Sequence, residues 1–518
     1  MRKTLASVAA VVVTSSLIVA APAVADHKDS KKSANSGSLT KAVTVNGILQ
    51  HQRQFQTIAD RNGGNRASGL PGHAASADYV AKKLKAAGYA VKRQKFTFPF
   101  FRQLEPATLT QLTPAEQELE TEIFDYSGGG DVTGTIVPTN DLVIPASPEP
   151  SSTSGCEASD FEAAPAEPAI ALIQRGSCDF AVKAANAASA GYDAAIIFNE
   201  GNPGRTDLSV GTLGAPATIP VVGLSYTDAV AIVDQSSTEA VTARVTTSVE
   251  VDLNRETENV IADLPTKGKK VKNADQVVVV GAHLDSVAVG PGINDNGSGS
   301  SAILEIAEEM SELKLTKKLE RPVRFAFWGA EESGLLGSEH YVAALSDAQR
   351  AKIYANLNFD MLGSPNYVRF VYDGDGSNGG PSGPPGSAQI EDVFTGFFEK
   401  KGLASEPTDF DGRSDYGPFI AAGIPAGGLF SGAEGVKTPE EAVTYGGTAG
   451  EAYDSCYHSG CDTITNLSTD ALQELGDAAA HATYVLTMSK KGLFGDANRK
   501  AAKVSDKKLK QYSPATAR

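Results

Sequence analysis

The sequence predicts an α/β protein in which helices cover both faces of a mixed, mostly parallel sheet. One reason is that short apolar runs alternate with segments whose apolar residues recur at helical spacing. A second is that the run at 277–280 is apolar without a break, as in strands buried on both faces. A third is that this alternation stops near residue 130 and returns near residue 258, which indicates an inserted domain.

The start of the chain has the pattern of an export signal. Two basic residues precede an apolar run at 8–21, and a small-residue cleavage site ends at Ala25. We therefore expect residues 1–25 to be a signal peptide of a secreted, extracellular protein, and the polar residues 26–38 to be a linker. The apolar run is shorter than the ~20 residues of a membrane-spanning helix, and no later segment is long and apolar enough to span.

The main domain is expected in two parts, at residues 39–130 and 252–490, with the insert at 131–251 between them. Its predicted helices and strands follow from helical spacing and from β-branched or aromatic runs. They are helices at 39–60 and 75–87, strands at 89–101, 260–262 and 277–280, a helix at 301–313, strands at 323–328 and 355–359, and helices at 389–401 and 470–488.

The insert has a pattern of its own, which predicts a small independent β/α domain. Its elements are a strand at 169–174, a helix at 180–190, strands at 194–198 and 219–224, and a helix at 227–233. Beyond the main domain, residues 491–518 are basic and without apolar periodicity, so we expect a flexible tail there.

Composition narrows the class of protein. The 518 residues allow two or three compact units, and the formal net charge of −16 disfavours nucleic acid and anionic membranes as partners. The four cysteines form two local pairs, Cys156 with Cys178 and Cys456 with Cys461. We predict two disulfides, because an exported chain meets an oxidising compartment and no Cys-x-x-Cys metal motif is present.

Three expected strands are followed by residues that carry chemistry. His283 follows the strand at 277–280, Glu331 and Glu332 follow the strand at 323–328, and Asp360 follows the strand at 355–359. Sheets of this class keep their sites at the carboxyl ends of the strands. Asp285, two residues after His283, is placed to accept the second ring N–H of that histidine.

Two further candidates lie in loops. Asp295 stands in the glycine-rich segment 293–299, and His458 stands between Cys456 and Cys461 in a loop that a disulfide would hold tight. Singly, each candidate has a simpler explanation, such as a helix cap or charge at a helix N-terminus. Together the two histidines and three of the carboxylates make the mixed N/O set that zinc accepts.

These motifs, in this order, resemble the di-zinc aminopeptidases related to bacterial leucyl aminopeptidases, glutamate carboxypeptidase and the transferrin receptor. The resemblance spans residues 39–488 and implies the zinc-exopeptidase fold and a metalloaminopeptidase acting on peptide or protein N-termini. It rests on Gly281-Ala-His-Leu-Asp-Ser286, Asn294-Asp-Asn-Gly-Ser-Gly299, Ala330-Glu-Glu-Ser-Gly-Leu-Leu-Gly-Ser338, Asn358-Phe-Asp-Met361 and Tyr457-His458.

The resemblance implies two Zn²⁺ ions per chain. His283 and Asp360 would hold one ion, Glu332 and His458 the other, and Asp295 would bridge them. Glu331 would be the general base that activates a water shared by the ions.

For substrate binding, the resemblance implies that Tyr457 hydrogen-bonds the oxyanion and that Arg413 orients the substrate. Asp360 and Glu331 would face the free ammonium group. Met361 and Cys456 would line a pocket for an apolar first residue.

The insert resembles a protease-associated domain through Ala171-Leu-Ile-Gln-Arg-Gly-Ser-Cys-Asp-Phe180 and Ala194-Ala-Ile-Ile-Phe-Asn199. Its expected role is substrate access or partner binding, in a protein that we expect to be a monomer. The alternatives are a carboxypeptidase or a one-zinc glutaminyl cyclase on the same fold, or a non-catalytic binding protein.

The other histidines of the chain have no acidic partner at ligand spacing in the sequence. We expect each to be structural or exposed and to lie outside the site. They are His27, His51, His73, His340 and His481.

Overall fold

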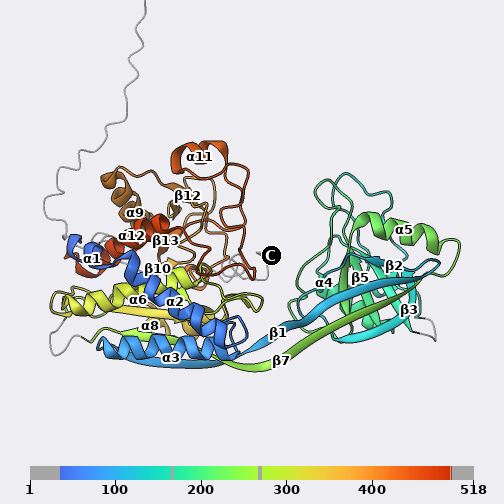
Figure 1. The fold of residues 1–518 in the computed structure, drawn as a ribbon, viewed down its shortest axis with the longest axis horizontal. Coiled ribbons are helices and arrows are strands. Elements are labelled where there is room, and N and C mark those ends of the chain that lie inside the picture. Colours follow the sequence, from blue (N-terminus) through green and yellow to red (C-terminus); the bar gives the residue numbers. More distant parts are fainter. Residues whose placement is uncertain (1–35, 165–167, 266–270, 491, 493–518) are drawn as a thin grey trace, which may run out of the picture.

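The computed structural model describes residues 36–164, 168–265, 271–490 and 492. The predicted signal peptide, most of the predicted linker and nearly all of the basic tail lie outside these ranges. Figure 1 shows two lobes joined by two long strands. We call residues 36–102 and 250–490 the main lobe and residues 103–249 the insert lobe.

Helices and strands alternate along much of the main lobe. The helices are α1 (Gly37–Ala42), α2 (Val45–Arg61), α3 (Pro71–Ala86), α6 (Gly297–Glu312), α7 (Leu336–Ala343), α8 (Asp347–Arg350), α9 (Ser387–Lys401), α10 (Gly417–Ala421), α11 (Pro439–Tyr445) and α12 (Thr469–Met488). The strands are β1 (Ala90–Thr113), β7 (Thr242–Asp263), β8 (Val277–His283), β9 (Val323–Trp328), β10 (Ile353–Phe359), β11 (Phe370–Tyr372), β12 (Glu406–Thr408) and β13 (Ala426–Phe430), of which β1 and β7 continue into the insert lobe.

The sheet of the main lobe has the order β12-β11-β13-β10-β8-β9-β7, and β1 pairs with β7 at its edge. Strands β13, β10, β8 and β9 are parallel to one another, whereas β11 is antiparallel to β13, and β7 is antiparallel to β9 and to β1. The predicted mixed, mostly parallel sheet is therefore confirmed in the part of the lobe that holds β8, β9 and β10.

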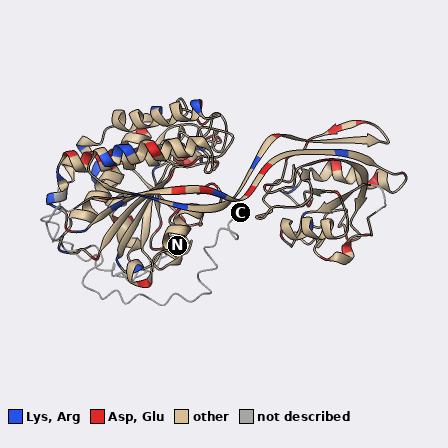
Figure 2. Ribbon diagram, turned by 90° about the horizontal axis from the view of Figure 1, so that it is seen from below, with Lys and Arg blue, Asp and Glu red and all other residues tan. Residues whose placement is uncertain are grey.

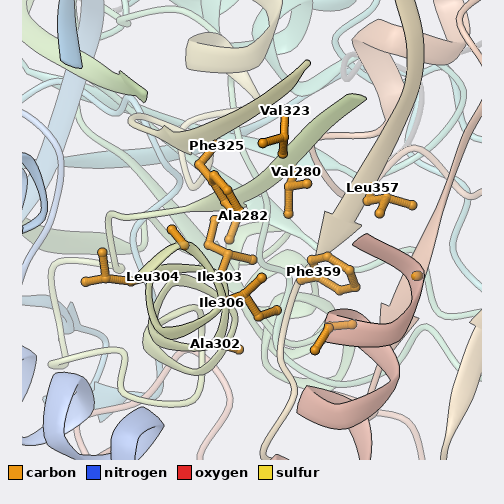
Figure 3. Close-up of a cluster of buried hydrophobic side chains, with 14 of the residues drawn as sticks. Val280, Ala282, Ala302, Ile303, Leu304, Ile306, Val323, Phe325, Leu357 and Phe359 are labelled. Atoms are coloured by element: carbon orange, nitrogen blue, oxygen red, sulfur yellow. The ribbon is translucent and has the colours of Figure 1, made fainter. Parts of the chain in front are cut away.

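Helices cover both faces of this sheet. On one face α2, α3, α6, α9 and α12 bury a large apolar core against the strands. Figure 3 shows part of it, where Ile303 and Ile306 of α6 face Val280 of β8 and Phe359 of β10. On the other face, α7 and α10 pack Tyr341 and Phe419 against Trp328. No helix in the described ranges is long and apolar enough to cross a membrane.

Strands β1 and β7 form an antiparallel ribbon that runs from the main lobe into the insert lobe (Figure 1). Charged residues of both signs line the ribbon where it leaves the main lobe (Figure 2). Arg102 lies directly opposite Glu250, and their side chains are 2.7 Å apart. Arg255 also binds Glu250, at 2.5 Å. The Arg102–Glu250 pair adds cross-strand attraction to the backbone hydrogen bonds, and Arg255 binds the same carboxylate from within β7.

The insert lobe is built on the outer halves of β1 and β7. Its other elements are β2 (Gln117–Leu119), β3 (Gly130–Pro138), β4 (Ala169–Gln174), α4 (Phe180–Ser189), β5 (Ala194–Phe198), β6 (Val221–Leu224) and α5 (Tyr226–Ser236). Strands β3 to β6 are parallel neighbours, and β3 pairs with β7. Leu109 and Phe124 are buried in the two cores of this lobe, so residues before the proposed limit at 131 also contribute to it.

Several elements have the predicted bounds, among them β4, β5 and β9. The helix expected at 39–60 is instead two helices, because Thr44 is extended and its side chain caps α2 by accepting from the Gly47 N–H. The first of them begins at Gly37, two residues before the expected start of order. The strands expected at 89–101 and 260–262 are inner parts of the much longer β1 and β7.

Candidate metal centre

Three parallel neighbours in the sheet, β10, β8 and β9, end at the same edge and bring their candidates together there. His283 is the last residue of β8, and Asp360 follows the last residue of β10. Glu331 and Glu332 follow β9 after a short turn. Asp360 Oδ1 lies 3.1 Å from His283 Nε2, and Glu331 Oε2 lies 3.8 Å from the same nitrogen.

Two loops complete the cluster. Asp295 Oδ1 is 3.1 Å from His283 Nε2, and its other oxygen, Oδ2, is 3.2 Å from His458 Nε2. Glu332 Oε2 is 3.0 Å from His458 Nε2. The structure thus gathers every residue that the sequence suggested as a metal ligand. Two overlapping groups of three donors each lie within 4.8 Å, His283, Asp295, Glu332 and His283, Glu331, Asp360, and His458 joins the first through Asp295 and Glu332.

The N-terminus of α6 fixes Asp295 against the end of β10. The Asn296 side chain donates to the carbonyl of Phe359 at 2.9 Å and accepts from the N–H of Gly299. Gly299 is needed there, because a Cβ at this position would lie 2.2 Å from the same carbonyl oxygen. This close approach keeps the carboxylates before α6 and after β10 at ligand spacing.

Both predicted disulfides are present. Cys456 and Cys461 close the loop that carries His458, and Cys156 and Cys178 are joined within the insert lobe. Asp462, directly after Cys461, accepts hydrogen bonds from the backbone N–H groups of Asn294 and Asp295 at 2.8 and 2.9 Å. The disulfide loop and the Asp295 loop are therefore tied to each other.

Two supporting residues were missed by sequence reasoning. Arg66 is fully buried and donates to the carbonyls of Leu284, Pro291 and Gly292 in the segment between His283 and Asp295. Ser414 donates to Asp360 Oδ2 at 2.5 Å, which leaves Oδ1 facing His283. The only signal for Arg66 was its place in a turn-rich loop, and Ser414 adjoins the Arg413 that was singled out.

Asp285 lies behind His283, as predicted, but its contact differs in detail. The ring Nδ1 is 3.2 Å from the backbone carbonyl of Asp285 and 3.7 Å from its carboxylate. The carboxylate instead accepts from the N–H of Glu331 at 3.3 Å. Asp285 therefore links the strand end of β8 to the turn that carries the two glutamates.

Negative charge dominates the cluster, since five buried or nearly buried carboxylates surround two imidazoles. Burial and the neighbouring Asp360 raise the pKa of Glu331 well above its usual range, against the opposing effect of His283. Burial lowers the pKa of His458, but Glu332 and Asp295 outweigh this and raise it to about 11. Such a set is stabilised by bound cations.

The donor set fits zinc. It offers imidazole nitrogen and carboxylate oxygen at the mutual spacing of ligands around one ion. Two of its buried oxygens, Oε1 of Glu332 and Oδ2 of Asp285, have no hydrogen-bond partner among the described residues. A buried carboxylate oxygen without a partner is costly, and a cation beside it removes that cost.

A cavity of about 920 Å³ opens over the cluster. Arg413 lies at its wall, where its guanidinium binds Glu434 at 2.7 Å and donates to the Tyr457 hydroxyl at 3.2 Å. The Tyr457 ring stacks on His458 with centroids 3.9 Å apart.

Met361 lines the cavity as expected, whereas Cys456 is not among the described residues that line it. Ile123, Asp125 and Tyr126 bring the insert lobe to the opposite wall.

Known proteins share this arrangement. The sequence model of Peptidase family M28 matches residues 259–483, and that of the PA domain matches residues 132–232. An aminopeptidase of Pseudomonas aeruginosa is 45% identical over 485 residues, which cover 92% of this chain and 87% of the relative. Leucine aminopeptidase 2 of Trichophyton equinum is 38% identical over 457 residues, covering 88% and 86%.

Solved structures give the same result. The aminopeptidase from Aneurinibacillus sp. strain AM-1 superposes with a TM-score of 0.66 at 27% identity, covering 87% of this chain and 95% of that one. A zinc aminopeptidase from Bacillus subtilis gives a TM-score of 0.60 at 26% identity, with 87% and 96% covered. Fold and site together define a zinc-dependent exopeptidase. The chain belongs to peptidase family M28, whose members include aminopeptidases, and it carries an inserted PA domain.

Proposed function

We propose that the protein is an aminopeptidase that uses two zinc ions to release apolar N-terminal residues from peptides. The observation that carries this proposal is the position of Asp295. Its two oxygens point to different histidines, at 3.1 Å from His283 and 3.2 Å from His458. A carboxylate in this position could serve two ions at once.

The ligands divide around that bridge. His283 and Asp360 would hold one ion, and Glu332 and His458 the other, so that each ion has three protein ligands and a free position. When bound, the zinc pair supplies Lewis acidity that polarises the scissile carbonyl and acidifies a water. The remaining steps fall to residues of the chain.

Glu331 is proposed to carry the proton. Its carboxylate lies at the cluster but farther from His283 than Asp295 or Asp360 does, at 3.8 Å. The raised pKa of Glu331 favours proton uptake from the attacking water. The same carboxyl group then gives the proton to the leaving amine.

Tyr457 and Arg413 are proposed to act on the substrate carbonyl. The Arg413 guanidinium holds the Tyr457 hydroxyl from one side, so that the hydroxyl hydrogen is free to point to an oxyanion. The stacking of the Tyr457 ring on His458 supports this role, because His458 is one of the proposed zinc ligands.

The cavity suits a free N-terminus and an apolar first side chain. Asp360 and Glu331 provide negative charge for the substrate ammonium group, which a blocked peptide lacks. Met361, Phe430 and Tyr372 supply apolar wall. Relatives named leucine aminopeptidase 2 support the same preference.

Zinc content and substrate choice test the proposal. Purified protein should hold two zinc ions at the proposed centre and cleave Leu-p-nitroanilide but not its N-acetyl derivative. Activity on blocked substrates alone would favour a carboxypeptidase. One ion at the centre, with cyclisation of N-terminal glutamine, would favour a glutaminyl cyclase. Two bound zinc ions without hydrolysis of any of these substrates would favour a non-catalytic binding protein.

We further propose that the chain is exported and works as a monomer outside the cell. The signal pattern at 1–25 and the two disulfides support export. Determining the N-terminal residue and the molar mass of the protein from culture medium tests both statements.

A further inference from the structure

We propose a second metal site, remote from the active site, in which His51 of α2 and Glu305 and Glu308 of α6 bind one zinc ion. The two glutamates are one turn apart on α6 and face the histidine across the helix interface. Their ligand atoms and His51 Nε2 all lie within 4.8 Å of one another. This site does not depend on the two-zinc proposal.

The distances match a zinc polyhedron. His51 Nε2 is 3.5 Å from Glu305 Oε2 and 3.3 Å from Glu308 Oε2. Zinc bonds of ~2.0–2.1 Å in tetrahedral directions place neighbouring ligand atoms roughly 3.3–3.4 Å apart. The two distances from His51 thus match this spacing, and the two glutamate oxygens lie within 4.8 Å of each other. A water would take the fourth position.

The histidine is oriented as a ligand. Its Nδ1 lies 2.6 Å from the Tyr79 hydroxyl, which can accept the Nδ1 hydrogen. Nε2 then carries the lone pair and points at the two carboxylates. The His51 side chain is 2% exposed, and Nε2 has no hydrogen-bond partner among the described residues. A lone pair facing two carboxylates needs a cation between them, either a metal ion or a proton.

The surroundings hold both carboxylates toward His51. Lys83 Nζ lies 2.9 Å from the second oxygen of Glu308 and so orients that carboxylate from outside. Gly47 leaves room for Glu305, because a Cβ there would be 1.8 Å from its Oε1. The two carboxylates and the Lys83 ammonium leave a net charge of −1 beside a neutral imidazole, which attracts a cation. One nitrogen ligand and few oxygens do not suit Ca²⁺, which takes six to eight oxygens.

The site would brace the catalytic framework. Helix α6 begins at Gly297, two residues after Asp295, and α2 packs along it. A zinc ion between them would fix the position of α6 and hence of the bridging carboxylate. Its role would be structural, since the proposed reacting groups lie at the carboxyl ends of the strands.

The difference in zinc content between wild type and a variant of this site tests the proposal, whatever the number of ions at the active site. Wild type, Glu308→Gln and the control Glu312→Gln are each dialysed against zinc-free buffer. The zinc content of each protein is then measured by plasma mass spectrometry. Glu312 is exposed at the end of α6. We expect Glu308→Gln to hold one zinc ion fewer than wild type and the control to hold the same number.

Crystals of the wild type give a measurement that does not depend on the folding of a variant. Diffraction at the zinc absorption edge should show an anomalous peak between His51, Glu305 and Glu308. Equal zinc content in wild type and Glu308→Gln, with no peak at this place, would overturn the proposal and leave a protonated His51. A count that falls from two to one with full activity would keep this site and refute the two-zinc active centre.

Discussion

Glu331 and Glu332 are adjacent in sequence, and the structure places both within ligand spacing of a histidine. Geometry alone therefore does not separate a metal ligand from a proton carrier. Their contacts differ, since Glu332 pairs with His458 at 3.0 Å while Glu331 stands 3.8 Å from His283. The difference suggests unlike roles that a substitution can separate.

Replacing Glu331 with Gln should leave zinc content unchanged and lower kcat by about 10²–10⁴-fold or more, because the amide cannot take up the proton. Zinc by mass spectrometry and kcat on Leu-p-nitroanilide check this. Glu339→Gln, an exposed change in α7, is the control. Loss of zinc from the Glu331 variant would show that this residue is a ligand.

His481 makes stability depend on pH. Burial and the nearby Lys400 and Lys401 lower its pKa from 6.5 to about 4. Below pH 6.5 the His481 side chain binds a proton in the unfolded chain but not in the folded chain. The contribution of His481 to the free energy of unfolding is therefore fully present above pH 6.5 and is lost as the pH falls toward 4.

We expect that loss to be about 1–3 kcal/mol, given that the side chain is partly exposed. His481→Gln should unfold in urea with a smaller drop in stability between pH 7 and pH 4 than wild type. An equal drop in the free energy of unfolding for the two proteins between pH 7 and pH 4 would contradict the role of His481.

The metal-binding candidates could be found from the sequence because each follows a strand or stands in a short motif. The sequence did not reveal the supporting roles of Arg66 and Ser414, nor the acidic partners of His51. Arg66 acts through carbonyl groups more than 200 positions away, and Glu305 and Glu308 meet His51 only when α2 and α6 pack. Such contacts depend on tertiary structure, which no local spacing encodes.

At the scale of elements, the centre depends on how closely α6 approaches β10. Gly299→Ala should cost about 1–3 kcal/mol of stability and weaken zinc binding, because the new methyl group meets the Phe359 carbonyl. Urea unfolding and zinc titration measure both effects. The control is Gly396→Ala in α9, where nothing lies within 4 Å and the helix should gain about 0.5–1 kcal/mol. Unchanged zinc affinity in the Gly299 variant would contradict this account.

Many of the elements that the sequence missed are short, although β3, with nine residues, and α7, with eight, were missed as well. Strands β11 and β12 have three residues each and β13 has five, which is too short for a period to show. The lengths of β1 and β7 also escaped detection. Their outer halves carry charged and polar residues because the ribbon between the lobes is exposed on much of its surface. Buried strands such as β9 were located because burial requires an apolar run.

At the scale of the whole molecule, we predict that the insert lobe, which lines part of the cavity, contacts long substrates. Joining Gln103 to Val249, which are paired across the ribbon, through an Asn-Gly turn would remove it with little change to the main lobe. The large core has no described member between 104 and 248.

We expect the shortened protein to cleave Leu-p-nitroanilide with kcat/KM within about threefold of wild type. For decapeptides, KM should rise about tenfold, corresponding to ~1.4 kcal/mol of lost contact with the wall that holds Ile123 and Tyr126. Equal KM values for decapeptides in both proteins would assign the insert another role.

The ribbon also bears on the order of folding. The inner halves of β1 and β7 form the edge of the main sheet, yet the whole insert lobe separates them in the chain. Closing an unstructured loop of that length costs ~4 kcal/mol in chain entropy. An insert lobe that folds early holds these strands side by side and removes most of that cost. Its core would then govern how fast the enzyme matures, even through residues far from any reacting group.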